Sequence, residues 1–351
     1  MKKLITVLLV VALLFSMAAC AGAGAKNDKY VGISMPTQDL QRWNQDGANM
    51  KEKFEAAGFK VDLQYANNEV ATQVSQIENM ISEGVKVLVI AAIDGKTLTQ
   101  VLGTAKDAKI AVIAYDRLIM DTDAVSYYCT FDNLKVGTIQ GQYIKDQLKL
   151  DEGGSYNIEL TTGDPADNNA PFFFKGAMDV LQPYIDSGVL KVPSGQVKFE
   201  EVATPDWSTE KSQARMEAIL ASFYADGTQL DACLCSNDST AKGVTNALAS
   251  SYTGKYPIVT GQDCDIANTK DMIAGKQSMS VFKDTRTLAA QTVTMASDIL
   301  AGKTPEVNDT TTYDNGTGII PTFLCSPVFA DVNNYKELLI DSGYYTEDKL
   351  K

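Results

Sequence analysis

The chain has 351 residues, 45% hydrophobic and 21% charged, which is ordinary for a globular protein and enough for about two domains. Its formal net charge is −13 with no basic stripe, which disfavours a nucleic-acid partner. The sequence contains no histidine, so Ser-His-Asp catalysis and histidine-rich metal sites are excluded.

The first twenty residues have the pattern of an export signal. Two lysines precede an apolar stretch that is too short to span a membrane comfortably, and Ala-Ala-Cys ends the segment at Cys20. This ending resembles the processing signal of bacterial lipoproteins. We therefore expect residues 1–20 to be a lipoprotein signal peptide, Cys20 to be lipidated, and residues 21–28 to be a flexible tether. Ordinary signal cleavage near Ala19 is the alternative.

Strands and helices alternate through the next hundred residues. The clearest unit is 76–95, in which a helical repeat stops at Gly84 and an apolar run over 85–93 predicts a strand buried on both faces. That strand delivers Asp94 to its carboxyl end. The strands predicted in this half are 30–36, 59–65, 85–93, 109–115 and 124–131.

The same alternation starts again after a helix at 136–148. The strands predicted here are 156–161, 196–202, 230–235, 257–260 and 278–282. A long helix follows at 285–300, and the tail beyond residue 318 is too short for a third domain. The pattern predicts an α/β fold with two doubly wound, Rossmann-like domains.

Five cysteines follow Cys20, an odd number that cannot all pair within the chain. Cys233 and Cys235 would face the same side of one predicted strand. A C-x-C sequence without a second pair is weak evidence for a metal site. We expect buried free thiols, no metal and no cofactor.

Several motifs occur in one order over almost the whole chain after the signal segment. They are LQRWNQDG from Leu40, the 76–95 block, AYDRLI at 114–119, FDN at 131–133, DPADNNA at 164–170, SND at 236–238, GQD at 261–263, FKD at 282–284 and NDTTTYDNG at 308–316. In these motifs the chain resembles the monosaccharide-binding lipoproteins of bacterial ABC importers, within the xylose- and multiple-sugar-binding branch of the periplasmic binding proteins.

The resemblance implies the type I periplasmic binding protein fold, with two domains joined by a three-segment hinge. The N-terminal domain would comprise 29–130 plus 285–320, and the C-terminal domain 131–284 plus 321–351. The chain would cross between them near 130–132, 283–285 and 321–324.

The resemblance also implies a function, which is extracytoplasmic capture of a monosaccharide of the xylose, glucose, galactose or arabinose type. The protein would be a monomer attached to the membrane by its lipid anchor only. It would deliver sugar to an ABC transporter permease with its cytoplasmic ATPase, and it would not be an enzyme.

The sugar would bind between the domains, at the carboxyl ends of the strands. A pyranose needs carboxylates to accept from its hydroxyls, Arg, Lys or Asn to donate to them, and aromatic rings to cover its C–H faces. Asp167 and Asn168 are reserve candidates. By resemblance, the nine expected sugar-binding residues are Arg42, Trp43, Asp94, Arg117, Asn169, Trp207, Asn237, Asp263 and Lys283.

Each of these residues also has a purely structural interpretation. Asp94, Asp132 and Asp263 could be helix N-caps, the arginines could be surface charges, and Trp43 could belong to the core. The triplet Phe172–Phe174 is assigned to the core or the domain interface. It is the combination of residues, rather than any single one, that predicts a site.

Three other functions deserve comparison. A glycosidase could use Asp94 and Asp263 as its acid and base, but no covalent-intermediate or cofactor motif accompanies them. A sensor would present the sugar to a membrane receptor, which is compatible with transport. A sugar-responsive repressor would need a DNA-binding helix pair where this chain has its signal segment.

Overall fold

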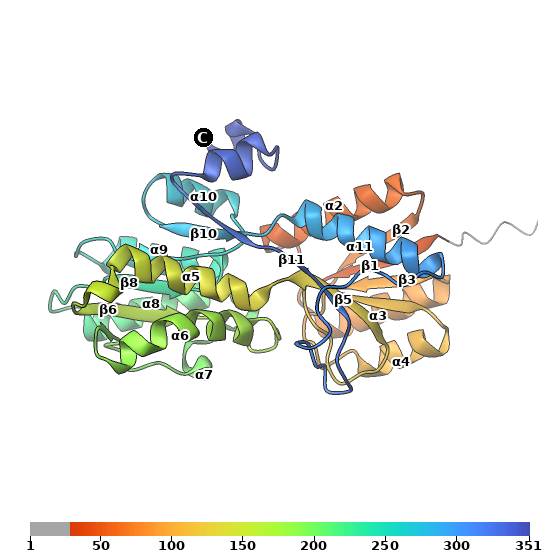
Figure 1. Ribbon diagram of the computed structural model, residues 1–351, viewed down its shortest axis with the longest axis horizontal. Coiled ribbons are helices and arrows are strands. Elements are labelled where there is room, and N and C mark those ends of the chain that lie inside the picture. Colours follow the sequence, from red (N-terminus) through yellow and green to blue (C-terminus); the bar gives the residue numbers. More distant parts are fainter. Residues whose placement is uncertain (1–28) are drawn as a thin grey trace, which may run out of the picture.

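The computed structural model describes residues 29–351, which form two lobes, each built around its own sheet (Figure 1). The expected signal peptide, the lipidation site at Cys20 and the tether at 21–28 lie outside the described residues. Within the described part, no helix combines the length and apolar character needed to cross a bilayer.

The first lobe contains a six-stranded sheet whose strands all run parallel, in the order β11-β5-β4-β3-β1-β2. Its strands are β1 (Tyr30–Met35), β2 (Lys60–Tyr65), β3 (Val87–Ile90), β4 (Ala111–Tyr115), β5 (Val125–Phe131) and β11 (Thr322–Cys325). Its helices are α2 (Gln41–Ala56), α3 (Val70–Glu83), α4 (Thr99–Asp107) and α11 (Thr285–Leu300).

Helices cover both faces of this sheet, and the strand sequences reflect it. In β3, Val87 and Val89 pack in the cluster formed with α2 and α11, whereas Leu88 and Ile90 pack in the cluster formed with α3 and α4. Successive side chains of a strand point to opposite faces, so a strand covered on both sides must be apolar throughout. The uninterrupted apolar run of this segment follows from that arrangement.

The second lobe repeats the design. Four parallel strands run in the order β7-β6-β8-β9, and the antiparallel pair β10-β12 extends the sheet through a bridge between Gln262 and Val281. Its strands are β6 (Tyr156–Thr161), β7 (Leu190–Lys191), β8 (Ala232–Cys235), β9 (Ile258–Val259), β10 (Met279–Phe282) and β12 (Val328–Asp331). The α/β fold with two doubly wound sheets is therefore confirmed.

Helices again cover both faces of this second sheet. Helices α5 and α6 pack on one face, and α8 and α9 on the other. The α-helices of this lobe are α5 (Asn133–Leu148), α6 (Ala170–Asp186), α7 (Phe199–Val202), α8 (Thr209–Phe223), α9 (Asp238–Ser251) and α10 (Ile266–Ile273). The short helical turns are η1 (Leu150–Glu152), η2 (Pro205–Trp207), η3 (Lys336–Asp341) and η4 (Glu347–Leu350).

Three segments connect the lobes. They lie between β5 and α5 at Asp132, between β10 and α11 at 283–284, and between β11 and β12 at 326–327. The third passage lies later than the expected 321–324, because β11 pairs with β5 and so belongs to the first sheet. The expected boundary at residue 321 was therefore wrong by the length of that strand.

The strand predicted at 196–202 was also wrong, because this segment ends in the helical turn α7. Phe199 and Val202 are three residues apart, so one helical turn places both against the rest of the second lobe. Val202 is buried there, and the partly buried Phe199 contacts the ring of Phe174. The Glu201 carboxylate accepts from the backbone N–H groups of Val197 and Lys198 at 3.0 Å each, which fixes the start of the turn.

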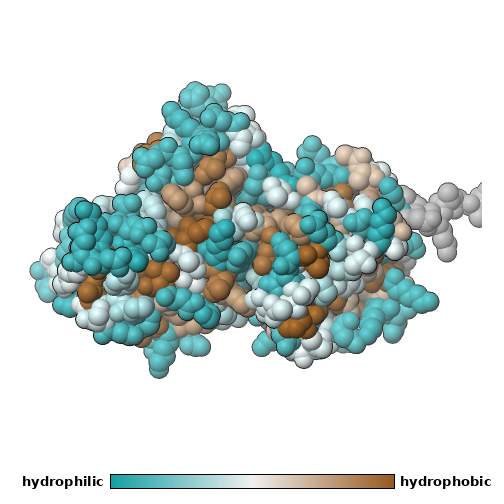
Figure 2. Space-filling model, viewed as in Figure 1, coloured by the Kyte–Doolittle hydropathy of each residue, from teal (hydrophilic) through white to brown (hydrophobic). Residues whose placement is uncertain are grey.

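All five cysteines of the described residues are buried free thiols, as predicted. Cys233 and Cys235 pack in the same cluster with α8 and α9, so they do face one side of β8. Figure 2 shows hydrophilic residues over the outer ends of both lobes, while hydrophobic residues gather nearer the middle of this face.

Candidate functional site

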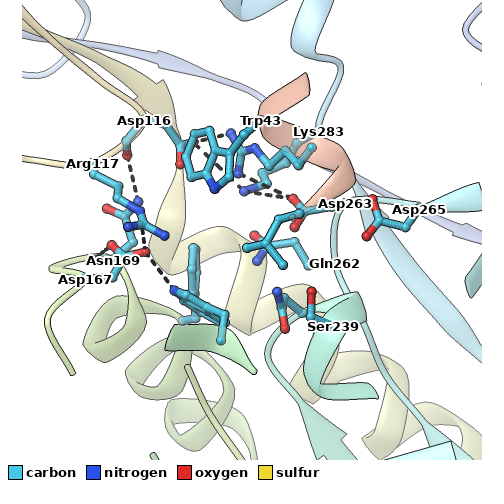
Figure 3. Close-up of a pocket in the computed structure, with 15 residues that line it drawn as sticks. Trp43, Asp116, Arg117, Asp167, Asn169, Ser239, Gln262, Asp263, Asp265 and Lys283 are labelled. Carbon is cyan, nitrogen blue, oxygen red and sulfur yellow. Dashed lines mark hydrogen bonds and ion pairs between the residues drawn. The ribbon is translucent and has the colours of Figure 1, made fainter. Parts of the chain in front are cut away.

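A cavity lies between the lobes, where the carboxyl ends of both sheets meet (Figure 3). The volume that the centres of water-sized molecules can occupy in it is about 30 Å³, so the side chains of the two lobes lie close together around a small space. The lining residues are Leu40, Arg42, Trp43, Asp116, Arg117, Asp167, Asn169, Phe173, Trp207, Asn237, Ser239, Gln262, Asp263, Asp265 and Lys283.

Of the nine predicted residues, all except Asp94 line this cavity. The Asp94 carboxylate instead accepts from the Lys96 backbone N–H at 2.9 Å, in a turn ahead of α4. The N-cap of α4 is Leu98, so Asp94 does not take the helix-capping role that was its structural alternative either. The reason is that β3 ends at Ile90, earlier than expected. The carbonyls of Ala92 and Ile93, which follow the strand, accept hydrogen bonds from Arg117 at 3.0 and 3.3 Å.

Of the two reserve candidates, Asp167 lines the cavity and Asn168 does not. The glycosidase alternative loses its geometric basis, because Asp94 and Asp263 do not share the cavity.

Arg42 connects three carboxylates from different parts of the chain. Its guanidinium contacts Asp46 at 3.0 Å, Asp263 at 3.4 Å, and Asp116 through a close ion pair. Asp263 belongs to the second lobe, so this arginine, which lies in the first turn of α2, makes an ion pair across the cavity. Charge-assisted hydrogen bonds of this kind are about twice as strong as neutral ones.

Two carboxyls of this group have pKa values that are shifted in opposite directions. Burial disfavours the charged form of Asp116, but Arg42 and Lys283 outweigh it and hold its pKa below the ordinary value. Burial raises the pKa of Asp46 to about 6 despite the favourable contact with Arg42. Asp116 therefore stays ionised and available as an acceptor for ligand hydroxyls.

Lys283 lies at the second connection between the lobes and is only 2% exposed. Its ammonium group is 3.2 Å from Asp263 and 4.0 Å from Asp116. The same group lies 5.6 Å from the ring centre of Phe173 and 5.8 Å from that of Phe131. A buried ammonium surrounded by two carboxylates and two rings is well compensated and can donate to a ligand.

Asp167 organises the other side of the cavity. One of its oxygens lies 3.0 Å from Nε of Arg117 and accepts from the indole N–H of Trp207 at 3.2 Å. The second oxygen accepts from the Asn169 backbone N–H at 2.9 Å. Burial raises the pKa of Asp167 above its ordinary value in spite of Arg117. The carboxylate thus fixes one cation and one ring, and it links the two lobes.

Asn169 is held by a network that also spans the lobes. Its amide nitrogen donates to the Asp116 carbonyl at 2.7 Å, and its oxygen accepts from Tyr128 and Asn133 at 2.9 Å each. The side chain is therefore fixed before a ligand arrives, which lowers the entropic cost of binding.

The aromatic residues are packed on the cations. The guanidinium carbons of Arg42 and Arg117 each lie 5.0 Å from the ring centre of Trp43. Trp43 also packs in the core cluster beneath α2, so its core and site interpretations both hold. Phe173 meets Trp207 edge to face, with ring centres 6.2 Å apart. These rings supply apolar surface inside a polar cavity.

Two amide side chains of the second lobe each keep one atom without a hydrogen-bond partner among residues 29–351. The oxygen of Asn237 caps α9 by accepting from the Thr240 N–H at 2.9 Å, which leaves the amide nitrogen for a ligand. Gln262 donates to the Ser236 carbonyl at 3.0 Å, and its own amide oxygen is buried without a partner among the described residues. A bound molecule with hydroxyl groups would satisfy both.

Two acidic residues of the cavity have left-handed backbone conformations, with φ of 59° at Asp116 and 97° at Asp263. This region is unfavourable for residues other than glycine, and such strain concentrates at ligand sites. The surrounding ion pairs hold the two carboxylates in place.

Sequence reasoning missed several lining residues. Asp116 and Gln262 each precede a predicted residue, in the AYDRLI and GQD motifs, so their position at strand ends was a usable signal. Phe173 was assigned to the core or interface, and it lies at the interface as a lining residue. Nothing in the sequence distinguished the others, which are Leu40, Ser239 and Asp265.

Residues 31–304 match the family described as periplasmic binding protein domain. The chain belongs to this family. Among relatives of this periplasmic binding protein, the multiple sugar-binding periplasmic protein SbpA of Azospirillum brasilense is 50% identical over 93% of this chain and 92% of its own length. The multiple sugar-binding periplasmic receptor ChvE of Rhizobium radiobacter is also 50% identical, over 94% of this chain and 95% of its own.

A solved structure is more similar still. An ABC transporter solute-binding protein from Clostridium phytofermentans, with bound β-D-glucose, is 68% identical and superposes with a TM-score of 0.91. The match covers 92% of this chain and 100% of that chain. These relatives are receptors and transporter proteins, and this periplasmic binding protein is likewise a binding protein rather than an enzyme.

Proposed function

We propose that this periplasmic binding protein captures an aldopyranose, with D-glucose as the preferred sugar, and delivers it to an ABC transporter permease. The observation that carries the proposal is the composition of the cavity. Cations, carboxylates and amides from both lobes surround one space between the lobes, which is flanked by tryptophan and phenylalanine. Its similarity to a protein crystallised with β-D-glucose supports that choice of sugar.

The cavity chemistry matches the needs of a sugar. Each hydroxyl donates one hydrogen bond and accepts others, so a pyranose requires both kinds of partner on every side. Asp116 and Asp263 supply acceptors, and Arg117 and Asn237 supply donors. A sugar is uncharged, so it brings no charge that would compete with these ion pairs.

We further propose that the lobes move as two domains about the three connections. The ion pairs Arg42–Asp263 and Arg117–Asp167 cross between the lobes in the conformation described here. A ligand favours the shut conformation only if it binds that conformation more tightly, which partners on both lobes allow. The permease would then recognise the shut form.

The remaining parts of the proposal concern attachment to the membrane, the oligomeric state and the transport partners. We propose that Cys20 carries the lipid anchor, that the protein works as a monomer outside the cytoplasm, and that its transport partners are a permease and the ATPase of that permease. Metabolic labelling with a fatty-acid analogue, compared between the native chain and Cys20→Ala, tests the anchor.

A panel of sugars tests the ligand assignment. We expect D-glucose to raise the melting temperature most. D-xylose and L-arabinose should raise it less because they lack the hydroxymethyl group, which is worth about 1–3 kcal/mol in a fitted pocket. D-galactose should raise it less because its inverted 4-hydroxyl would leave a polar partner unpaired. The sugars should be recovered unchanged after incubation. No rise with any aldopyranose would contradict the proposal, and conversion of a sugar into product would indicate an enzyme.

A further inference from the structure

The lobes also meet outside the cavity, at the C-terminal tail that follows η3. Tyr345 belongs to the second lobe, because its ring is 3% exposed and packs in the cluster that contains Met272 and Leu339. Tyr344 precedes it, with its ring 4.8 Å from those of Tyr345 and Phe282. Both hydroxyl groups point toward the first lobe, as their hydrogen-bond partners establish.

Those partners lie on α2, next to the residues that line the cavity. Gln41 and Gln45 are one helical turn apart and so share one side of the helix. Their amide nitrogens donate to the Tyr345 hydroxyl at 2.7 and 3.0 Å. The Tyr344 hydroxyl donates to the Gln45 amide oxygen at 3.2 Å. The Tyr344 hydroxyl also shares a hydrogen bond with the Thr285 hydroxyl of α11 at 3.1 Å. Tyr344 and Tyr345 thus make four hydrogen bonds across the lobes.

The same side chains also hold the segment that delivers Asp263 to the cavity. The Gln41 oxygen accepts from the Ile266 backbone N–H at 3.1 Å, and the Tyr345 hydroxyl donates to the Cys264 carbonyl at 3.0 Å. This segment contains two residues in left-handed conformation, Asp263 and Cys264. Such a backbone needs external contacts to keep one geometry.

We infer that Gln41, Gln45, Tyr344 and Tyr345 form an interlobe clasp, which positions the 263–266 segment against Arg42 and slows the release of bound ligand. The inference deepens the proposed function and depends on it in taking the ligand to be a sugar. The clasp residues do not line the cavity, so they act on the ligand through closure and through Asp263. Contacts that exist only with the lobes together should affect dissociation more than association.

The test compares two Tyr→Phe variants. Tyr345→Phe removes the hydroxyl and keeps the ring in its apolar cluster. The matched control is Tyr143→Phe, because the Tyr143 hydroxyl donates to the Ser278 carbonyl at 3.1 Å within the second lobe. Stopped-flow tryptophan fluorescence measures the release of D-glucose from each protein.

We expect Tyr345→Phe to speed release about 5- to 20-fold, as the loss of two or three neutral hydrogen bonds implies, with association changed less than about twofold. The control should release sugar at the native rate. Gln45→Leu should act in the same direction, and its effect should not add fully to that of Tyr345→Phe, because the two side chains share a bond. Native release rates in both Tyr345→Phe and Gln45→Leu, even with a lowered melting temperature, would overturn the inference.

A second measurement tests the clasp without any sugar. Spin labels on Glu55→Cys in α2 and Ala218→Cys in α8 report the distance between the lobes, since both positions are exposed and the five native thiols of residues 29–351 are buried. Cys20→Ala is added to both proteins so that no label attaches there. Tyr345→Phe should shift the distances to longer values, and Tyr143→Phe should not. If D-glucose fails to bind the native chain, the proposed function fails, but this shift still supports the clasp. Unchanged distances would refute it.

Discussion

At the scale of single residues, the cavity depends on pairs of charges drawn from distant parts of the chain. Arg117 follows β4 in the first lobe, and Asp167 precedes α6 in the second, yet they form a buried ion pair at 3.0 Å. Asp167 also holds Trp207, so one carboxylate fixes a cation and a ring. The side chains that would contact a ligand are thus oriented before it arrives.

Arg117→Ala should weaken sugar binding by more than about 1.5 kcal/mol, or tenfold, because it removes a charged donor and leaves Asp167 buried without its cation. Titration calorimetry measures the affinity. Lys106→Ala is the control, since Lys106 forms an exposed ion pair with Asp123 in the first lobe. Equal affinity in Arg117→Ala and the native chain would remove Arg117 from the site.

Gly163→Ala should weaken binding about tenfold or more by displacing the indole of Trp207. A Cβ at residue 163 would lie 1.9 Å from Cη2 of that ring, far inside van der Waals contact. Ring displacement should also break the hydrogen bond to Asp167 and change the tryptophan emission spectrum. An unaltered spectrum with native affinity would show that the ring does not need this space.

At the scale of secondary-structure elements, the residues that cap helices at the lobe boundary differ in whether they line the cavity. Asp132 begins α5 at the first connection, and its carboxylate accepts from the Lys135 N–H at 2.9 Å. It does not line the cavity. Asn237 caps α9 in the same manner, but it does line the cavity. A helix-capping residue can therefore also face a ligand.

Asp132→Ala should therefore lower the free energy of unfolding by about 1 kcal/mol, the usual worth of an N-cap, and leave sugar affinity within about twofold. Denaturant unfolding and calorimetry measure the two quantities. A large loss of affinity with unchanged stability would mean that Asp132 contacts the ligand after all.

Elements with a strong apolar pattern could be predicted from the sequence, and their exact ends could not. The run at 85–93 identified β3, but the strand stops at Ile90, and that difference moved Asp94 away from the cavity. The segment 196–202 alternates weakly and was taken for a strand, whereas capping by Glu201 makes it helical. Where a strand or a helix ends depends on contacts with distant residues, which a local sequence pattern does not record.

The candidate site was predicted largely by family resemblance combined with strand-end position. Pairings such as Arg117 with Asp167 join segments about fifty residues apart, and only the packed lobes determine them. The clasp between Tyr345 and α2 was not predicted for the same reason.

At the scale of the whole molecule, buried carboxyls make stability depend on pH. Burial and the neighbouring Asp263 raise the pKa of Asp265 to about 7, and burial raises that of Asp46 to about 6, against about 3.9 in an unfolded chain. Between these values the folded protein binds more protons than the unfolded one. Stability without ligand should therefore fall as pH rises from about 4 to 7.

Asp265→Asn should flatten this dependence, since an amide does not titrate. We expect the loss of unfolding free energy between pH 5 and 7.5 to shrink by on the order of 1–2 kcal/mol relative to the native chain. Urea unfolding at a series of pH values measures it. A native pH slope in the variant would show that Asp265 is ionised throughout this range.

The proposed function requires that the space between the lobes bind a sugar. Titration calorimetry with D-glucose on the native chain at neutral pH tests it directly. We predict one site per chain with a dissociation constant of about 1 μM or tighter, equivalent to at least about 8 kcal/mol. The proposed function would be contradicted if millimolar D-glucose produced no binding heat and no other aldopyranose bound either.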